Sequence, residues 1–435
     1  YEQQFNELIT ERRIVLLGSN VYLREIYDSE RIIEGKILEL SREKHDDTTD
    51  FFKNFAHTLG HFSEEQLEAV RLSTGNGFLV LTGGPGTGKT TTLKGIIDLY
   101  KKCKLKIALA APTGRAAKRM AEVIGLEAKT IHRLLEYEPV TGKFVHNKSN
   151  PIKANLLVVD EVSMINTFLM ASLLYAVDRE TTVVFVGDKD QLPAIGPGNI
   201  LHDILEYDKV PIIRLNKIFR QAEQSRIITN SHLINRGMMP DLSNNKDGDF
   251  FFIEQEDSRQ IPDLLLDLVG KRLPAKYGFD PFTDIQILAP MYRGDAGVDA
   301  INKCLQDGLN ANQVVLTRGE VEFKMKDKFM QLVNDYERDI YNGDIGYLTG
   351  VNDEEDQLVF NFGDREVGFT VTELDDITLA YACTIHKSQG SEYPCVIVVL
   401  TNEQYFMLKR NLIYTAITRA SNLLLIVGSK RAVHR

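Results

Sequence analysis

Apolar runs that end in small or polar residues recur along the first half of the chain. An amphipathic pattern at residues 63–74 predicts a helix. Four strand-like runs follow it, at residues 78–84, 106–114, 155–163 and 181–192. Helical stretches separate these runs, which is typical of buried parallel strands whose carboxyl ends carry functional loops. The pattern therefore predicts an α/β domain.

A second series of strand-like runs lies farther along the chain, at residues 212–221, 284–294, 395–400 and 422–429. It predicts a second α/β domain. Residues 314–376 interrupt this series with short alternating runs and turn sequences such as Tyr-Asn-Gly-Asp. Such a segment indicates a small β-barrel inserted into the second domain.

Shorter segments complete the organisation. Residues 7–17 and 25–44 place apolar residues at helical spacing between charges, so residues 1–60 are predicted to be helical. Residues 136–154 lie between two predicted strands of the first domain. Their Thr-Gly pair, flanked by β-forming residues, predicts a hairpin.

The chain has 435 residues, which at about 100–200 residues per domain predicts roughly two to four domains. Its net charge of -10 argues, taken alone, against a nucleic-acid partner, although a large acidic protein can still line one groove with Lys and Arg. The four cysteines form no CxxC pair, so neither a disulfide framework nor a zinc site is predicted, and a reducing cytoplasm fits. No apolar run approaches the ~18 residues of a membrane span. The chain begins YEQQF, without Met or a signal-peptide pattern, which suggests a fragment.

The sequence TGGPGTGKTTTL, at residues 82–93, predicts a phosphate-binding loop. It fits G-x-x-x-x-G-K-[ST], and it lies between a predicted strand and a predicted helix, as this motif requires. The glycines allow backbone N–H groups to face phosphate oxygens. Lys89 would neutralise the β and γ phosphates, and the Thr90 hydroxyl would bind Mg²⁺. The alternative is a glycine-rich turn without a ligand, which the motif and its context together disfavour.

Polar side chains end the third and fourth of the strand-like runs in the first half of the chain. Asp160 would hold Mg²⁺ through water, and Glu161 would activate the attacking water. In isolation this pair would be interpreted as an exposed acidic turn. Asp188 and Gln191 follow the later strand, and a glutamine there can orient water or sense the γ-phosphate, because its amide both donates and accepts. A plain polar turn is an equal alternative.

Two arginines lie in the second series, Arg220 in LNKIFRQ and Arg419 in YTAITRAS. Guanidinium groups stabilise the charge that develops in phosphoryl transfer. If both domains flank one nucleotide, its hydrolysis becomes motion. The alternative is that both arginines form ordinary surface salt bridges.

Eight motifs occur in one order: GGPGTGKT, APTGRAAKRM, TIHRLL, VVDEVSM, GDKDQLPAIGPG, LNKIFRQ, TIHKSQGSE and YTAITRA. This order resembles a superfamily 1B DNA helicase of the RecD family, in the stand-alone form found outside the RecBCD complex. The resemblance covers about residues 60–435. It implies an α/β fold with two RecA-like P-loop NTPase domains, an inserted β-hairpin, an inserted SH3-like β-barrel and an N-terminal helical segment. The implied boundaries are 1–60 for the helical segment, 61–212 for the first RecA-like domain with the hairpin at 136–154, 213–313 and 377–435 for the second, and 314–376 for the barrel.

The resemblance also implies roles for single residues. Gln66 matches a glutamine that reads adenine, although it could instead form a capping box with Ser63. Gln191 matches a γ-phosphate sensor, and Arg220 and Arg419 match arginine fingers. The implied ATP site further holds Gly84, Pro85, Gly86, Thr87, Gly88, Lys89, Thr90, Thr91, Asp160, Glu161 and Glu392. The implied DNA-binding residues are Pro112, Thr113, Arg115, Thr130, His132, Arg133, Arg293, Thr384, His386, Lys387, Ser388 and Gln389.

Some of these residues have structural alternatives. A histidine such as His132 or His386 can simply bond to the backbone. The hairpin rings Tyr137, Phe144 and His146 can pack on their own strands rather than stack on a base.

The function implied is an ATP- and Mg²⁺-dependent DNA helicase that moves 5′ to 3′ on single-stranded DNA and unwinds duplex in repair or recombination. The implied partners are single-stranded DNA, its junctions with duplex, and single-stranded-DNA-binding or repair proteins, with the chain itself a monomer in the cytoplasm. One alternative is an ATP-gated single-stranded nucleic-acid clamp or remodelling adaptor without strand displacement. A nuclease-helicase and an RNA helicase are further alternatives.

Overall fold

The computed structural model describes residues 2–42, 47–207, 209–219, 224–363 and 365–434. The chain divides into two compact units. Unit 1 comprises Tyr1–Lys189 and Pro193–Ile218, and unit 2 comprises Asp190–Leu192 and Phe219–Arg435. Each unit contains a parallel sheet, so the predicted pair of α/β domains is confirmed. The strand at residues 212–215, which the sequence placed in the second series, pairs with the strand at residues 78–83 in the sheet of unit 1, so that placement is wrong.

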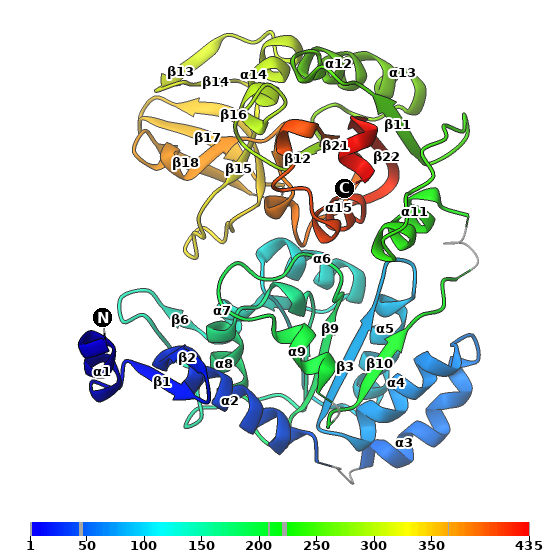
Figure 1. Ribbon diagram of the computed structural model, residues 1–435, viewed down its shortest axis with the longest axis vertical. Coiled ribbons are helices and arrows are strands. Elements are labelled where there is room, and N and C mark those ends of the chain that lie inside the picture. The colour runs from blue at the N-terminus through cyan, green and yellow to red at the C-terminus, as the bar shows by residue number, and fades with distance from the viewer. Residues whose placement is uncertain (1, 43–46, 208, 220–223, 364, 435) are drawn as a thin grey trace. The chain divides into compact units, whose positions relative to one another are not determined.

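Unit 1 is centred on a parallel sheet with the strand order β10-β3-β9-β8-β4-β5. Figure 1 labels β10, β3 and β9 of this sheet. Side chains of the interior strand β3 alternate between two cores. Leu79 and Leu81 pack with helices α4 and α5, whereas Phe78 and Val80 belong to the opposite core with α8 and α9. Burial on both faces explains the near-continuous apolar runs of these strands. The bounds are α4 (Glu64–Gly75), β3 (Phe78–Gly83), α5 (Lys89–Lys102), β4 (Ile107–Ala111), α6 (Gly114–Ile124), β5 (Ala128–Thr130), α7 (Ile131–Leu134), β8 (Leu156–Val159), α8 (Thr167–Tyr175), β9 (Thr182–Gly187), α9 (Ile200–Glu206) and β10 (Ile212–Leu215).

The N-terminal segment is helical except for one hairpin. Helices α1 (Glu2–Thr10), α2 (Arg24–Leu40) and α3 (Asp47–Phe55) flank the antiparallel pair β1 (Ile14–Leu17) and β2 (Asn20–Leu23). The prediction of a helix through residues 7–17 is therefore wrong beyond α1. Arg12 and Gly18 have φ values of 56° and 62°, which end the helix and form the turn of the hairpin. The residues between them include β-branched Ile and Val, which favour a strand.

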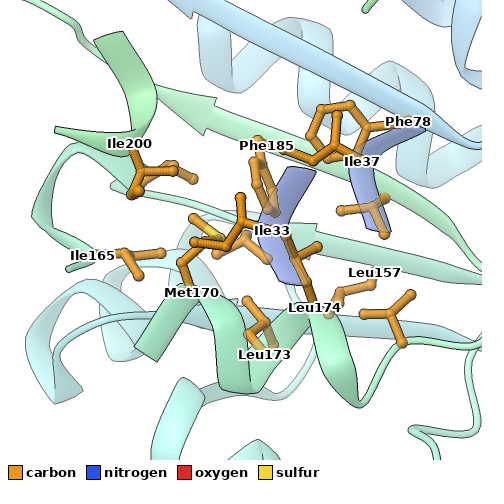
Figure 2. Packing of buried hydrophobic residues seen from close by; sticks show 14 of the residues in the cluster. Ile33, Ile37, Phe78, Leu157, Ile165, Met170, Leu173, Leu174, Phe185 and Ile200 are labelled. Atoms are coloured by element: carbon orange, nitrogen blue, oxygen red, sulfur yellow. The ribbon is translucent and has the colours of Figure 1, made fainter. Parts of the chain in front are cut away.

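Helix α2 packs against the rest of unit 1 through its apolar stripe. Figure 2 shows Ile33 and Ile37 among Met170 and Leu173 of α8 and Phe185 of β9. The predicted hairpin is also present in this unit, as β6 (Tyr137–Glu138) and β7 (Lys143–Phe144), which pair antiparallel.

Unit 2 contains a parallel sheet with the strand order β11-β22-β21-β12-β20. Its elements are α11 (Arg226–Asn235), β11 (Phe250–Glu254), α12 (Ile261–Asp267), α13 (Leu273–Tyr277), β12 (Ile285–Ala289), α14 (Val298–Leu309), β20 (Ala382–Thr384), β21 (Tyr393–Leu400), α15 (Arg410–Ile417), β22 (Ala420–Gly428) and α16 (Lys430–His434). No helix in the described part of the chain has the length and apolar content needed to cross a membrane.

An antiparallel insertion lies between α14 and β20, where the sequence predicted a small β-barrel. It consists of the hairpin β13 (Val314–Arg318) and β14 (Val321–Lys324) and a sheet of the order β18-β17-β16-β15-β19. The sheet strands are β15 (Lys328–Gln331), β16 (Ile345–Asn352), β17 (Gln357–Asn361), β18 (Glu366–Thr370) and β19 (Ile377–Leu379). The fully buried carboxylate of Asp327 joins the insertion to its surroundings, because it accepts hydrogen bonds from Gln306 and Asn310 of the α14 end and from Tyr381.

Candidate nucleotide and DNA sites

The loop between β3 and α5 has the backbone geometry of a phosphate site. Gly86 and Gly88 have φ values of 73° and 85°, a left-handed conformation that other residues disfavour. A Cβ atom on Gly83 would lie 2.6 Å from Thr87 Oγ1 and 2.8 Å from the carbonyl oxygen of Leu215, so this position also excludes a side chain. The loop therefore curves tightly into the N-terminus of a long helix, where unpaired N–H groups favour anions.

Lys89 lies over this loop. Its Nζ donates hydrogen bonds to the carbonyl oxygens of Gly83 and Gly84, at 2.5 and 3.0 Å. Thr90 and Thr91 follow it in the first turn of α5 and are exposed. An ammonium group, hydroxyl groups and backbone N–H groups are thus presented together.

Asp160 and Glu161 directly follow β8. Burial, together with the neighbouring Glu161 carboxylate, raises the pKa of Asp160 to about 6, while the positive charges of Lys89 and Arg119 act in the opposite direction. Lys89 is therefore within electrostatic reach of this carboxylate. Glu161 has a φ value of 51°, and such strain in a residue other than glycine is typical of functional sites.

The oxygen donors here fit a magnesium ion. The Thr90 hydroxyl and the Asp160 carboxylate are hard ligands, and Mg²⁺ is commonly held by one or two carboxylates together with substrate phosphates. Among the residues that the structure describes, no group of three or more His, Cys, Asp or Glu could form an all-protein metal cage. This donor set fits an ion that arrives with a nucleotide.

Gln66 combines two local contacts. It forms the capping box of α4 with Ser63, so that structural prediction is confirmed. Its Nε2 also donates to the carbonyl oxygen of Gly88 at 3.4 Å, which links the start of α4 to the phosphate loop. Adenine recognition by Gln66 stays a prediction.

The segment after β9 crosses the boundary between the two units. Lys189 belongs to unit 1, and Asp190–Leu192 belong to unit 2. Asp188 is 2% exposed. Gln191 Oε1 is buried, and no described group donates a hydrogen bond to it. A buried amide oxygen without a donor is uncommon and needs a functional or structural explanation.

The DNA-binding residues predicted for unit 1 follow two neighbouring strands. Ala111 of β4 pairs with Thr130 of β5, so the loops after these strands begin at one sheet edge. Thr113 and Thr130 are helix N-caps, whose hydroxyl oxygens accept hydrogen bonds from the backbone N–H groups of Ala116 and Arg133, at 3.2 and 3.1 Å. Of the other predicted residues here, Pro112 and Arg115 are partly exposed and Arg133 is exposed.

His132 belongs to a cluster of aromatic rings at the hairpin. Its ring centroid lies 5.8 Å from those of both Tyr137 and Phe144, which are themselves 5.2 Å apart. Burial lowers the pKa of His132, which favours its neutral form. Tyr137 and Phe144 thus pack on each other and on His132, as the structural alternative predicted.

The DNA-binding residues predicted for unit 2 lie in loops that begin where two neighbouring strands end. Thr384 of β20 pairs with Ala289 of β12, the strand that precedes exposed Arg293. Burial lowers the pKa of both His386 and Lys387, and Lys387 Nζ donates to Asn342 Oδ1 at 2.8 Å. The rest of this loop faces inward. Ser388 is fully buried and donates to the carbonyl oxygen of Ile385 at 2.8 Å, and Gln389 is 6% exposed.

Comparison with known proteins identifies the family. Residues 66–197 match the AAA domain, residues 301–362 the ATP-dependent RecD-like DNA helicase SH3 domain, and residues 379–427 the UvrD-like helicase C-terminal domain. The RecBCD enzyme subunit RecD of Mycolicibacterium smegmatis is 30% identical over 453 residues, a match that covers 96% of this chain and 80% of that protein. The chain belongs to the RecD family. The resemblance drawn from the eight motifs is therefore confirmed.

Another RecD relative is longer than this chain. The ATP-dependent RecD2 DNA helicase of Deinococcus radiodurans is 37% identical over 370 residues, which cover 85% of this chain and 49% of that protein. The chain thus spans about half the length of this relative.

Among solved structures, the Pif1 helicase from Bacteroides in complex with ADP-AlF3 and ssDNA has a TM-score of 0.51 and 22% identity, covering 84% of this chain and 92% of that one. The Pif1 helicase from Candida albicans has a TM-score of 0.50 and 21% identity, and the match covers 86% of this chain and 98% of that one. At these identities the likeness extends to the fold.

Arg419 of this RecD-family chain is a buried guanidinium with neutral partners. It is 3% exposed, so the interpretation as a surface salt bridge is wrong. Its Nε donates to the carbonyl oxygen of Thr415 at 3.1 Å, its Nη1 to that of Ser391 at 3.0 Å and its Nη2 to Thr418 Oγ1 at 3.2 Å. A buried charge is usually paired with an opposite charge, so this arginine is suited to meeting an anion. Glu392 lies next to Ser391 and is exposed, and Arg220 lies outside the described residues.

Sequence reasoning missed Arg119 and Asn342. Arg119 acts electrostatically on Asp160, and its spacing of four from Arg115 within a predicted helix would have placed both on one helix face. Asn342, in the insertion, holds Lys387, and no sequence signal connects the two.

Proposed function

We propose that this RecD-family chain is an ATP-dependent DNA helicase, which moves 5′ to 3′ along single-stranded DNA and unwinds duplex. The observation that carries the proposal is the phosphate loop of unit 1, with Lys89 within electrostatic reach of Asp160, in a chain of this family. The Deinococcus relative bears the name of an ATP-dependent DNA helicase. The direction of movement rests on the family alone.

In the proposed cycle, the loop N–H groups and the N-terminus of α5 bind the phosphates of ATP. Lys89 moves from the loop carbonyls to the β and γ phosphates. Thr90 and Asp160 would hold Mg²⁺, which when bound would neutralise charge on the phosphates. Glu161 takes a proton from the attacking water, and Gln191 orients that water through its unpaired Oε1.

Residues of unit 2 complete the proposed reaction. Arg419 stabilises the charge on the transferring phosphoryl group, together with Arg220. We also assign adenine recognition to Gln66 and a contact near the ribose to Glu392.

DNA binding is assigned to the loops at the carboxyl edges of the two sheets. In unit 1 these are the loops after β4 and β5, and in unit 2 the loops after β12 and β20. Short hydroxyl, amide and cationic groups there suit phosphate oxygens and need not read sequence. The proposed ligands are single strands and their junctions with duplex.

The proposed setting follows from this activity. We place the protein in the cytoplasm as a monomer that serves repair or recombination alongside single-stranded-DNA-binding proteins. The free cysteines fit a reducing compartment.

ATP hydrolysis and strand displacement, measured together, test the proposal. We expect single-stranded DNA to stimulate hydrolysis more than RNA of the same sequence does, and a forked duplex to be unwound. Lys89→Ala removes both activities, whereas Lys94→Ala, an exposed change on the same helix, retains them. Stimulated hydrolysis without displacement would favour the clamp, and stronger stimulation by RNA would favour an RNA helicase.

A further inference from the structure

The three residues Asp190–Leu192 are held by unit 2 on both sides of Gln191. The backbone N–H of Leu192 donates to Thr415 Oγ1 at 2.9 Å, and Gln389 Nε2 donates to the Leu192 carbonyl oxygen at 3.1 Å. On the other side, Asn235 Nδ2 donates to Asp190 Oδ2 at 2.6 Å. We call the pair of bonds to the Leu192 backbone the Leu192 latch.

The latch is enclosed by protein. Leu192, Gln389 and Thr415 are 6%, 6% and 0% exposed, and the Leu192 side chain packs in the core of unit 2 with Leu412. Water therefore does not compete for these hydrogen bonds, which strengthens them. The Thr415 hydroxyl donates to the carbonyl oxygen of Asn411 at 2.7 Å, so its lone pairs are left to accept from Leu192.

The same few residues also orient Arg419. Its Nε donates to the Thr415 carbonyl oxygen, and its Nη1 donates to the carbonyl oxygen of Ser391, two residues after Gln389. One buried cluster in unit 2 thus fixes the backbone beside Gln191 and the guanidinium of Arg419. Gln389 has little surface left for DNA, and Thr384, which begins the same motif, is also only 6% exposed.

We infer that Gln389 and Thr415 are positioning residues for ATP hydrolysis, which fix the Leu192 backbone and so aim Gln191, and that Gln389 is not a DNA contact. This inference rests on the proposed function and revises one of its assignments. Catalytic side chains need placement to within about 0.5 Å, and a displacement of about 1 Å can cost roughly a hundredfold in rate. Loss of either latch bond frees the backbone beside Gln191 by such amounts.

Matched variants separate positioning from DNA binding. Gln389→Ala removes one latch bond and Thr415→Val the other, while Thr415→Ser retains the hydroxyl. We expect the first two to lower kcat of the DNA-stimulated ATPase by about tenfold or more. The Kd for a dye-labelled oligothymidine, measured without nucleotide, should stay within about twofold, and Thr415→Ser should restore most of kcat. Gln191→Ala combined with Gln389→Ala should be no slower than Gln191→Ala alone, because the two residues act as one unit.

Two results would overturn the inference. One is a Gln389→Ala protein with a normal kcat at saturating DNA and a Kd for the oligothymidine raised about tenfold. The other is a double variant whose kcat loss is the product of the single losses.

Hydrogen exchange separates failure of the latch from failure of the proposed function. We expect the Leu192 amide of the nucleotide-free protein to exchange slowly in wild type and at least about tenfold faster in Thr415→Val. Equal exchange in the two proteins would contradict the latch whatever the activity. If the Leu192 amide exchanges slowly but the wild-type protein has no DNA-stimulated ATPase, the latch exists but the proposed function is wrong. The latch would then have no role in catalysis.

Discussion

Replacing Asp160 with Asn should make the nucleotide-free protein more stable while it removes activity. Burial and Glu161 raise the pKa of Asp160 from 3.8 to about 6. The folded protein therefore binds this proton more tightly than the unfolded chain does. The stabilisation that this proton gives to the folded state is fully present below pH 3.8, the pKa in the unfolded chain. It is lost as the pH rises through about 6, the pKa in the folded protein. Above pH 7 the ionised carboxylate costs about 3 kcal/mol, which Asn does not incur.

Urea unfolding at pH 8 and pH 5 provides the assay. Because the two units need not unfold together, hydrogen exchange of β8 should report the transition of unit 1. We expect the free energy of unfolding of unit 1 to be higher in Asp160→Asn than in wild type, by about 3 kcal/mol at pH 8 and by about half of that at pH 5. Asp98→Asn, an exposed change on α5, should stay within about 0.5 kcal/mol of wild type. An advantage of Asp160→Asn that is absent at pH 8, or that grows on acidification, would refute the reasoning.

Further predictions concern packing, catalysis and DNA binding. Ile37→Ala should lower the free energy of unfolding of unit 1 by about 2–5 kcal/mol in urea, because Ile37 is 3% exposed, whereas Leu38→Ala, at 39% exposed, should cost under about 1 kcal/mol. Equal losses would contradict the packing of α2. Arg419→Lys should lower kcat of the ATPase by about a hundredfold or more with DNA affinity unchanged, since a lysine lacks the planar fork; a parallel loss of DNA affinity would speak against this role. Lys387→Ala should weaken binding of single-stranded DNA and reduce the slope of log K against log salt by about 0.7, and an unchanged slope would remove Lys387 from the DNA contacts.

Local geometry explains what the sequence alone could predict. The phosphate loop depends on consecutive residues, so its glycines, Lys89 and the adjoining strand and helix could be placed from the sequence. Asp160 and Glu161 could be placed for the same reason, because an apolar strand delivers them to a known end of a parallel sheet.

Long-range contacts explain what the sequence could not predict. Gln389 bonds to Leu192 across 197 positions, and only the folded chain shows that its amide is used there rather than presented to DNA. The placement of the buried Arg419 likewise depends on the carbonyl oxygen of Ser391, 28 positions away. At the N-terminus, the helical spacing of residues 7–17 was overridden by the left-handed backbone at Arg12 and Gly18.

Strand displacement from tailed duplexes tests the central claim most directly. Duplexes with a single-stranded 5′ tail or 3′ tail are incubated with ATP and Mg²⁺, and the released strand is measured for wild type and Lys89→Ala. We predict release from the 5′-tailed duplex by wild type only. Release that requires a 3′ tail, or that persists in Lys89→Ala, would contradict the account.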